Sequence, residues 1–148
     1  MKLRPEVTLE RLRERVQIGL PQLVGLQVIA LRENALLMRL PVRAEVLAPN
    51  GYLHAAAVVA LADTCCGFAC AAHLPEGAVN FTTIELKSNF LGTATDGTIE
   101  TEATAVHLGR NTHVWDAPVR HVETGKTIAL FRCTHMVLWP RQDKAAAP

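Results

Sequence analysis

One charged side chain interrupts the most apolar stretch of this 148-residue chain. From Ala55 to Ala72 every residue is small, apolar, or carries a thiol or hydroxyl, except Asp63, and His54 stands immediately before the stretch. An ionised carboxylate in apolar surroundings is costly unless it is paired or has a chemical task. A partly buried carboxylate also has a raised pKa, which suits it to act as a base near neutral pH. These residue types can therefore supply proton abstraction or nucleophilic attack by Asp63.

Residues 55–72 predict a single helix, because Ala, Leu and Val lie on both sides of Asp63. In the alternative, Asp63 is the N-cap of a helix that starts at Thr64, since Asp is a favoured N-cap. In the single helix, the backbone N–H groups of Ala55 and Ala56 lie at the N-terminus, where free donors and the helix dipole favour negative charge. That end of the helix could stabilise an oxyanion.

The spacing of His54 and Asp63 has a geometric consequence. The two residues are nine positions apart, which places them about 13 Å apart along a helix and on opposite sides of it. They cannot meet on one substrate atom within one chain. Two chains with antiparallel helices would bring His54 of one chain to Asp63 of the other, and two-fold symmetry would give two such sites. His54 either contacts substrate or orients its turn by a hydrogen bond.

The composition excludes several classes of protein. Apolar residues make up 49% and charged residues 20%, which is globular, and 15 basic residues nearly balance 14 acidic ones. No basic patch, zinc-finger spacing or glycine-rich phosphate loop argues for nucleic acid or nucleotide binding. The N-terminus lacks the apolar core of a signal peptide, and no segment favours a membrane span. We therefore expect a cytoplasmic protein without a nucleic-acid or membrane partner.

The four cysteines, Cys65, Cys66, Cys70 and Cys133, are expected to be small buried thiols. In an alternative, Cys66, Cys70 and His73 share one helical face and ligate zinc. Because no CxxC pair supplies a second half to that site, we expect no metal and no cofactor. The other histidines are scattered and carry no functional signal.

The remaining pattern predicts a short helix and six strands. Residues 8–18 are amphipathic, and Gly19 and Pro21 end that helix. Strands are expected at 23–32 and 35–43, joined by a turn at 33–34, and a loop with a turn at 49–51 precedes the long helix. Four strands follow at 79–91, 97–108, 112–122 and 127–139, with turns at 109–111 and 123–126. In the first of these, period two places Thr83, Glu85, Lys87 and Asn89 on one face and Ile84, Leu86 and Phe90 on the other.

This order of elements predicts an α+β fold, in which an antiparallel sheet wraps around one long central helix. A helix that is apolar nearly all round should be covered nearly all round. We expect a single domain over 1–148, with an N-terminal helix in 1–19, a core in 20–139 and a frayed tail in 140–148.

Three segments, NGYLH, ALADTCCG and TTIELKSNFLGTA, resemble the hot-dog-fold acyl-CoA thioesterases of the phenylacetate-pathway (PaaI-like) type. The resemblance covers about residues 20–139, and its most specific part is Gly51, His54, Asp63 and Gly67. It implies the hot-dog fold, hydrolysis of an acyl-CoA thioester to a free acid and CoA without a cofactor, and a homodimer or a dimer of dimers (a homotetramer).

The resemblance also implies roles for single residues. In the family, the amide N–H after the histidine polarises the thioester carbonyl, and that position is Ala55. The family acid, a base or nucleophile, matches Asp63, and a hydroxyl that holds the water or the acid matches Thr83. The family has two glycines where this chain has Ala55 and Ala56, which is tolerated if φ is negative there. Relatives commonly carry Asn or Gln six residues before the histidine, where this chain has Ala48, and Asn50 is our candidate to replace it.

CoA must be held by its phosphates. The turn Gly109-Arg110-Asn111-Thr112 resembles the G-R-x-T turn of the family, and an arginine is suited to phosphate. Lys87 is a second candidate for this task, and the two tryptophans are expected to serve packing. Two other functions stay open: a non-catalytic acyl-CoA-binding protein, which the double alanine and Ala48 favour, and a hydratase or dehydratase of the same fold.

Overall fold

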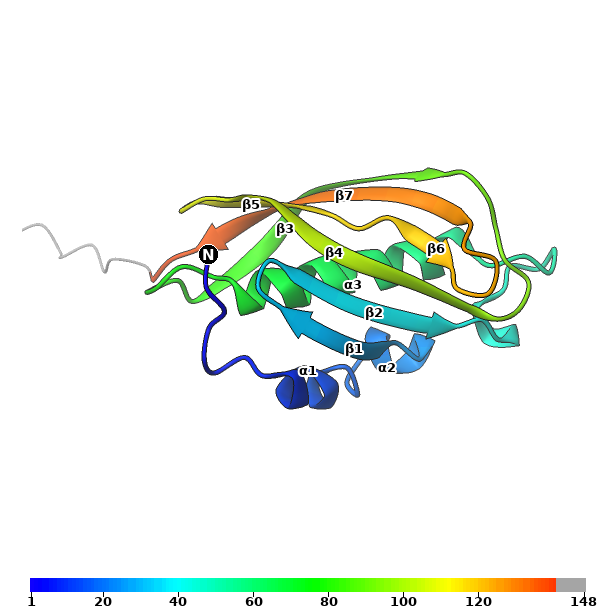
Figure 1. Cartoon of the computed structure of the whole chain (residues 1–148), viewed down its shortest axis with the longest axis horizontal. Coiled ribbons are helices and arrows are strands. Elements are labelled where there is room, and N and C mark those ends of the chain that lie inside the picture. The colour runs from blue at the N-terminus through cyan, green and yellow to red at the C-terminus, as the bar shows by residue number, and fades with distance from the viewer. Residues whose placement is uncertain (141–148) are drawn as a thin grey trace, which may run out of the picture.

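The computed structural model describes residues 1–140, so all of the tail expected at 140–148 except its first residue lies outside the described residues. Within 1–140, the chain forms one antiparallel sheet with the long helix α3 packed along one face, as the sequence predicts (Figure 1). The elements are α1 (Leu9–Arg15), α2 (Leu20–Val24), β1 (Gln27–Arg32), β2 (Ala35–Pro41), a short 3₁₀ helix (Ala44–Val46), α3 (Ala55–Ala72), β3 (Asn80–Phe90), β4 (Thr98–Leu108), β5 (Thr112–Asp116), β6 (Val119–His121) and β7 (Thr127–Leu138).

The strand order is β1-β2-β4-β5-β7-β3, and the short β6 pairs with both β4 and β7. All pairings are antiparallel. The predicted turn between β1 and β2 places Asn34 at φ 61°, a left-handed conformation that Asn tolerates. The N–H of Asn34 donates to Nε2 of His73 over 2.8 Å, so the hairpin is fixed to the C-terminal end of α3.

Helix α3 runs without a break from Ala55 to Ala72, as predicted. Asp63 therefore lies in the middle of the helix, and the N-cap alternative is wrong. The residues that face the sheet are fully buried: Leu61, Ala62, Cys65, Cys66, Ala69 and Cys70. On the opposite side Ala56 is exposed and Ala60 and Asp63 are only half-buried, so one chain covers only part of the helix. The expectation of nearly complete cover is wrong for a single chain.

The N-terminal region differs from the prediction at two points. The predicted strand at 23–32 begins only at Gln27, because residues 20–24 form helix α2. Pro21 occupies the first turn of α2, where its missing N–H is harmless, and Gly25 ends the helix at φ 81°. The next strand, predicted to reach residue 43, ends at Pro41.

The predicted strand at 112–122 is two strands. Strand β5 ends at Asp116 and β6 begins at Val119, with Ala117 and Pro118 between them. The continuous alternation of apolar residues favoured a single strand. Pro118 interrupts it, because proline has no N–H to donate to a neighbouring strand. The turns predicted at 109–111 and 123–126 are confirmed.

Candidate active site

His54 forms the N-cap of α3. Its backbone is extended, with φ −68° and ψ 133°, and its Nδ1 accepts a hydrogen bond from the N–H of Ala56 over 2.9 Å. This is the turn-orienting role that the sequence allowed for the histidine. Because Nδ1 is the acceptor, a neutral ring carries its proton on Nε2, which is left as a donor on an exposed side chain.

The first turn of α3 leaves one amide free. The N–H of Ala56 is used by His54, and that of Ala57 donates to the backbone oxygen of His54 over 2.9 Å. The N–H of Ala55 has no acceptor within residues 1–140, and the residue is exposed. Neither alanine has a positive φ, so both fit where the resembling family has glycine. Ala55 therefore keeps the predicted donor, whereas the N–H of Ala56 is already occupied.

The carboxyl group of Asp63 lies half-buried on the middle of α3. Its Oδ1 is buried and has no hydrogen-bond partner among the described residues. Burial raises the pKa of Asp63, while the charge of His135 and a hydrogen bond from Thr83 act in the opposite direction. A carboxylate with a raised pKa and a free buried oxygen is suited to accept a proton or to attack an electrophilic carbon.

Thr83 reaches Asp63 because of an irregularity in β3. Thr83 is opposite His135 in β7, and Glu85 is opposite Thr134, so Ile84 is an extra residue between two registers. Such a bulge reverses the alternation of side chains. Thr83 therefore faces α3 together with the buried His135, while Glu85 accepts a hydrogen bond from Thr134 on the outer face. The predicted grouping of Thr83 with Glu85 and Lys87 on one face is wrong.

A layer of thiols and imidazoles lies beneath α3. All four cysteines are free and buried, as predicted. Burial and the neighbouring Cys133 raise the pKa of Cys66, whereas the hydrogen bond from Cys66 and the nearby His135 lower the pKa of Cys133 to about 6. We call Cys66, Cys70, His113, Cys133 and His135 the buried Cys–His cluster.

The predicted zinc alternative does not fit this arrangement. Nδ1 of His73 lies 2.8 Å from the backbone oxygen of Ala69, and Nε2 accepts from Asn34, so both ring nitrogens are used. Cys70 turns instead to His113, with 3.4 Å between Sγ and Nδ1. No group of three metal-binding side chains occurs within the part of the chain that the structure describes.

The predicted phosphate-binding turn has a support that the sequence did not reveal. The N–H of Gly109 donates to the oxygen of Thr112 over 2.9 Å, and the oxygen of Asn111 accepts from Val137 of β7 over 2.8 Å. The guanidinium carbon of Arg110 lies 4.2 Å from the ring centre of Trp139. Stacking on an aromatic face holds a guanidinium in a defined orientation. Trp139 therefore does more than pack, while the fully buried Trp115 belongs to the core as predicted.

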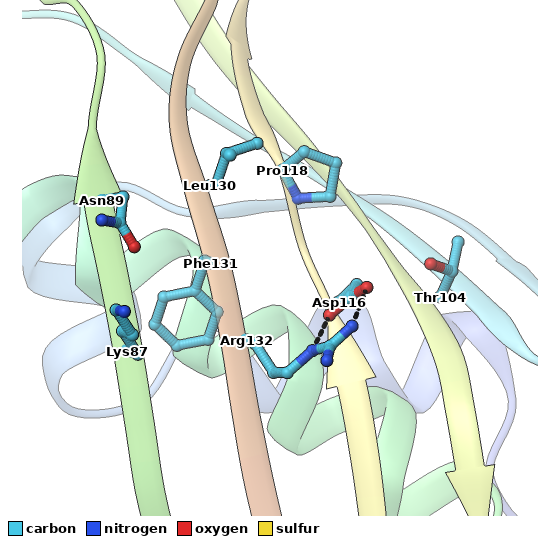
Figure 2. Close-up of a pocket in the computed structure, with 8 residues that line it drawn as sticks. All are labelled: Lys87, Asn89, Thr104, Asp116, Pro118, Leu130, Phe131 and Arg132. Atoms are coloured by element: carbon cyan, nitrogen blue, oxygen red, sulfur yellow. Dashed lines mark hydrogen bonds and ion pairs between the residues drawn. The ribbon is translucent and has the colours of Figure 1, made fainter.

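Lys87 lies apart from the other candidates. It is opposite Arg132 in the ladder and lines a cavity of about 430 Å³ on the outer face of the sheet, away from α3. Figure 2 shows the Arg132 guanidinium at this cavity, paired with both carboxylate oxygens of Asp116 at 2.5 and 2.7 Å. The structure thus separates Lys87 from Asp63 by the thickness of the sheet.

A second cavity, of about 300 Å³, adjoins the start of α3. It is lined by Leu20, Val24, Glu45, Val46, Leu47, His54, Ala56, Ala57 and Ala60. The sequence did not reveal this cavity, because no helix was predicted at 20–24 and the predicted strand began at residue 23. Asn50 stays in the preceding loop, where its side-chain oxygen accepts from the N–H of Tyr52 over 3.2 Å.

Known proteins share this sequence pattern and this architecture. Residues 50–133, more than half of the chain, match the family described as the thioesterase superfamily. The chain is 28% identical over 117 residues to 1,4-dihydroxy-2-naphthoyl-CoA hydrolase of Listeria monocytogenes, covering 79% of this chain and 94% of that protein.

Two solved structures confirm the hot-dog fold. A thioesterase from Haemophilus influenzae superposes with a TM-score of 0.88 at 28% identity, covering 97% of this chain and 99% of the other. The phenylacetic acid degradation protein PaaI from Thermus thermophilus superposes with a TM-score of 0.71 at 26% identity, covering 79% and 96% of the two chains.

Proposed function

Because this chain belongs to the thioesterase superfamily, we propose that it hydrolyses acyl-CoA thioesters to the free acid and CoA. The observation that carries the proposal is the free N–H of Ala55 at the start of an 18-residue helix. A thioester carbonyl oxygen placed there would meet both a hydrogen-bond donor and the positive end of the helix dipole. The carbonyl oxygen is the atom on which negative charge develops when the carbonyl carbon is attacked.

Asp63 supplies the second requirement of the reaction. Its carboxylate either attacks the carbonyl carbon directly or removes a proton from the water that does so. The tetrahedral intermediate then collapses, the carbon–sulfur bond breaks, and the departing CoA thiolate takes up a proton. In the direct route, water subsequently cleaves the acyl-aspartate anhydride. Thr83, which faces α3 beside Asp63, would hold the carboxyl group or the water.

The site is completed by a second copy of the chain. His54 and Asp63 stand on opposite sides of α3, and one side of that helix is not covered within a chain. Strand β3 is an edge of the sheet and exposes Ile84, Leu86 and Phe90, each at least 43% accessible. Two chains joined along these features, with antiparallel helices, would place Ala55 of one near Asp63 of the other. A homodimer is therefore the smallest complete unit, and a dimer of dimers would contain four sites.

The CoA phosphates are assigned to the turn that carries Arg110. In Figure 1, the turn between β4 and β5 lies at the opposite end of the molecule from the start of α3. The antiparallel arrangement of two chains brings these ends together. Trp139 orients the guanidinium of Arg110, and Asn111 and Thr112 hold the turn in place.

The acyl group is assigned to the cavity beside His54. Apart from Glu45 and His54, its lining is aliphatic, which favours an apolar acyl chain or an aromatic ring. The relative from Listeria monocytogenes is named for a naphthoyl-CoA substrate. Aromatic and medium-chain aliphatic acyl-CoAs are therefore the first compounds to test.

The test is turnover of an acyl-CoA panel, measured by release of the CoA thiol, with Asp63→Asn as the matched control. We expect turnover of at least one apolar acyl-CoA that falls at least about a hundredfold in the variant. Tight binding without thiol release would instead indicate an acyl-CoA-binding protein. Hydration of an enoyl-CoA would indicate a hydratase.

A further inference from the structure

Helix α2 forms one wall of the cavity beside His54. Leu20 and Val24, the first and last residues of α2, line this cavity of about 300 Å³. They stand at positions i and i+4, so their side chains lie on the same face of the helix. Helix α3 packs against α2 and supplies a second wall, which consists of Ala56, Ala57 and Ala60. Because alanine side chains are short, the two helices leave this space open between them.

Helix α2 has little support from the hydrophobic core. Among its five residues, all of them described, Val24 is the one that packs against the core, and none is fully buried. Leu23, on another face of the helix, is 74% exposed. A helix of this length is not stable by itself in water. Its position must therefore be fixed by contacts from outside the helix.

Arg43 supplies such a contact. Its Nη2 donates to the backbone oxygen of Leu23 over 2.8 Å, in the last turn of α2, where carbonyl groups lack partners within the helix. Its Nη1 lies 3.3 Å from the carboxylate of Glu45, which lines the same cavity. A Cβ on Gly25 would lie 3.2 Å from Nη2, so the glycine that ends α2 also makes room for the guanidinium. Arg43 thus joins α2 to the segment that carries Glu45.

The proposed oxyanion site fixes where an acyl group would enter the cavity. Its donor, the N–H of Ala55, immediately precedes two alanines of the cavity lining, Ala56 and Ala57. Ala60 lies five residues after Ala55, which is about 7.5 Å further along the helix axis. An acyl chain that follows α3 from the carbonyl group therefore contacts Ala60 only if it extends that far.

We propose that this cavity selects the acyl group by size: Val24 and Ala60 are specificity-determining residues, and Arg43 is the positioning residue that holds α2 over the cavity. This inference rests on the assignment of the acyl group to this cavity under the proposed function. The preferred substrates are apolar acyl groups long enough to reach Ala60, because shorter groups leave part of the apolar lining uncovered. One methylene group more or less in a hydrophobic pocket changes discrimination between substrates by about 10–200-fold.

The test measures kcat/KM for butanoyl-CoA, octanoyl-CoA and dodecanoyl-CoA. Ala60→Leu fills part of the cavity, so we expect the ratio of octanoyl-CoA to butanoyl-CoA to fall at least about tenfold. Val24→Ala enlarges the cavity, and alanine is the better helix former, so the ratio of dodecanoyl-CoA to octanoyl-CoA should rise by about tenfold. The two variants act in opposite directions, so either one tests the inference if the other does not fold.

Leu23→Ala is the matched control for these variants. It removes an aliphatic side chain from the same helix, but Leu23 does not line the cavity. Both ratios should therefore stay at their wild-type values in Leu23→Ala. Unmoved ratios in the folded cavity variants, or an equal movement in Leu23→Ala, would overturn the inference.

Arg43→Gln tests the positioning role. We expect KM for octanoyl-CoA to rise about tenfold, with little change in kcat and in KM for butanoyl-CoA, because only the longer group depends on the wall that α2 forms. Arg43→Lys keeps a cationic donor for the Leu23 carbonyl and for Glu45, and should restore KM. An equal loss of kcat for both substrates, or no recovery in Arg43→Lys, would refute the positioning role.

Binding measured without turnover separates this inference from the proposed function. The thioethers S-butyl-CoA and S-octyl-CoA have no carbonyl group and cannot be hydrolysed. Calorimetry should show tighter binding of S-octyl-CoA to the wild type, and Ala60→Leu should remove that preference while Leu23→Ala keeps it. This result in a protein that hydrolyses no acyl-CoA would refute the hydrolase and retain the size selection. Equal affinity of the wild type for both thioethers would refute the size selection even in an active hydrolase.

Discussion

Replacing Ala55 by proline would remove a single hydrogen-bond donor from the proposed oxyanion site. Ala55 is the first residue of α3, a position where proline fits because its N–H has no intrahelical partner. The preceding residue must be extended, and His54 already is, with φ −68° and ψ 133°. The substitution therefore deletes the N–H without disturbing the helix.

Ala55→Pro should lower catalytic activity while leaving stability unchanged or raising it. Loss of one oxyanion-hole donor typically lowers kcat by about 10²–10³-fold, or roughly 3–4 kcal/mol of transition-state stabilisation. The N–H of Ala56 cannot replace it, because it is bonded to Nδ1 of His54 over 2.9 Å. The free energy of unfolding should remain equal or rise by about 0.4–1 kcal/mol, since proline restricts the unfolded chain and breaks no native bond.

Ala55→Gly is the matched control, because it alters the same side chain and retains the N–H. Thiol release from the best acyl-CoA and the thermal midpoint should be measured for both variants. We expect Ala55→Gly to retain most of the activity and Ala55→Pro to lose it at an unchanged or higher Tm. An Ala55→Pro protein with near-normal kcat would refute the oxyanion assignment, and one with a strongly lowered Tm would refute the helix-start geometry.

Three further predictions follow from single side chains. Asp63→Asn should lower kcat at least about a hundredfold with little change in KM. Burial raises the pKa of Asp63, so the substitution should also raise Tm near pH 8. That gain in Tm should vanish in melts below about pH 3, where the side chains of Asp63 and of the Asn variant are both neutral. Arg110→Ala should raise KM for acyl-CoA more than it lowers kcat in steady-state assays. Burial raises the pKa of Glu100, but Arg120 and Arg39 outweigh it and hold the pKa below its usual value. Glu100→Gln should therefore lower the free energy of unfolding by about 1–3 kcal/mol at pH 7, and urea titrations should show that loss shrinking as the pH falls below about 4.

The helix that carries the candidate site could be predicted because its signals are local. A run of small apolar residues fixes α3 from Ala55 to Ala72, and the position of Asp63 within it follows directly. The donor at Ala55 follows from where the helix begins. The two short elements that were misassigned also had local signals: Pro21 lies in the first turn of α2 and Gly25 ends it, and Pro118 interrupts the strand after Asp116.

The surroundings of Asp63 could not be predicted, because they depend on pairing between distant segments. The bulge at Ile84 turns Thr83 toward α3, and no glycine or proline in the sequence marks it. His135 occupies an ordinary inward position of an alternating strand, and only the register with β3 places it opposite Thr83. The stacking of Arg110 on Trp139 likewise joins two segments that the sequence separates.

Within residues 1–140, strand β3 is attached to the sheet on one side alone, through its ladder with β7. An edge strand opens at a lower free energy than a strand held on both sides, so β3 belongs to the part of the fold that detaches first under mild denaturant. Each opening carries Thr83 away from Asp63 while α3 and the central strands persist. If Thr83 and Asp63 act together as proposed, activity would be lost on local opening of this strand, before global unfolding. A second copy of the chain along that edge would raise the opening free energy, so that activity and amide protection would both increase with protein concentration.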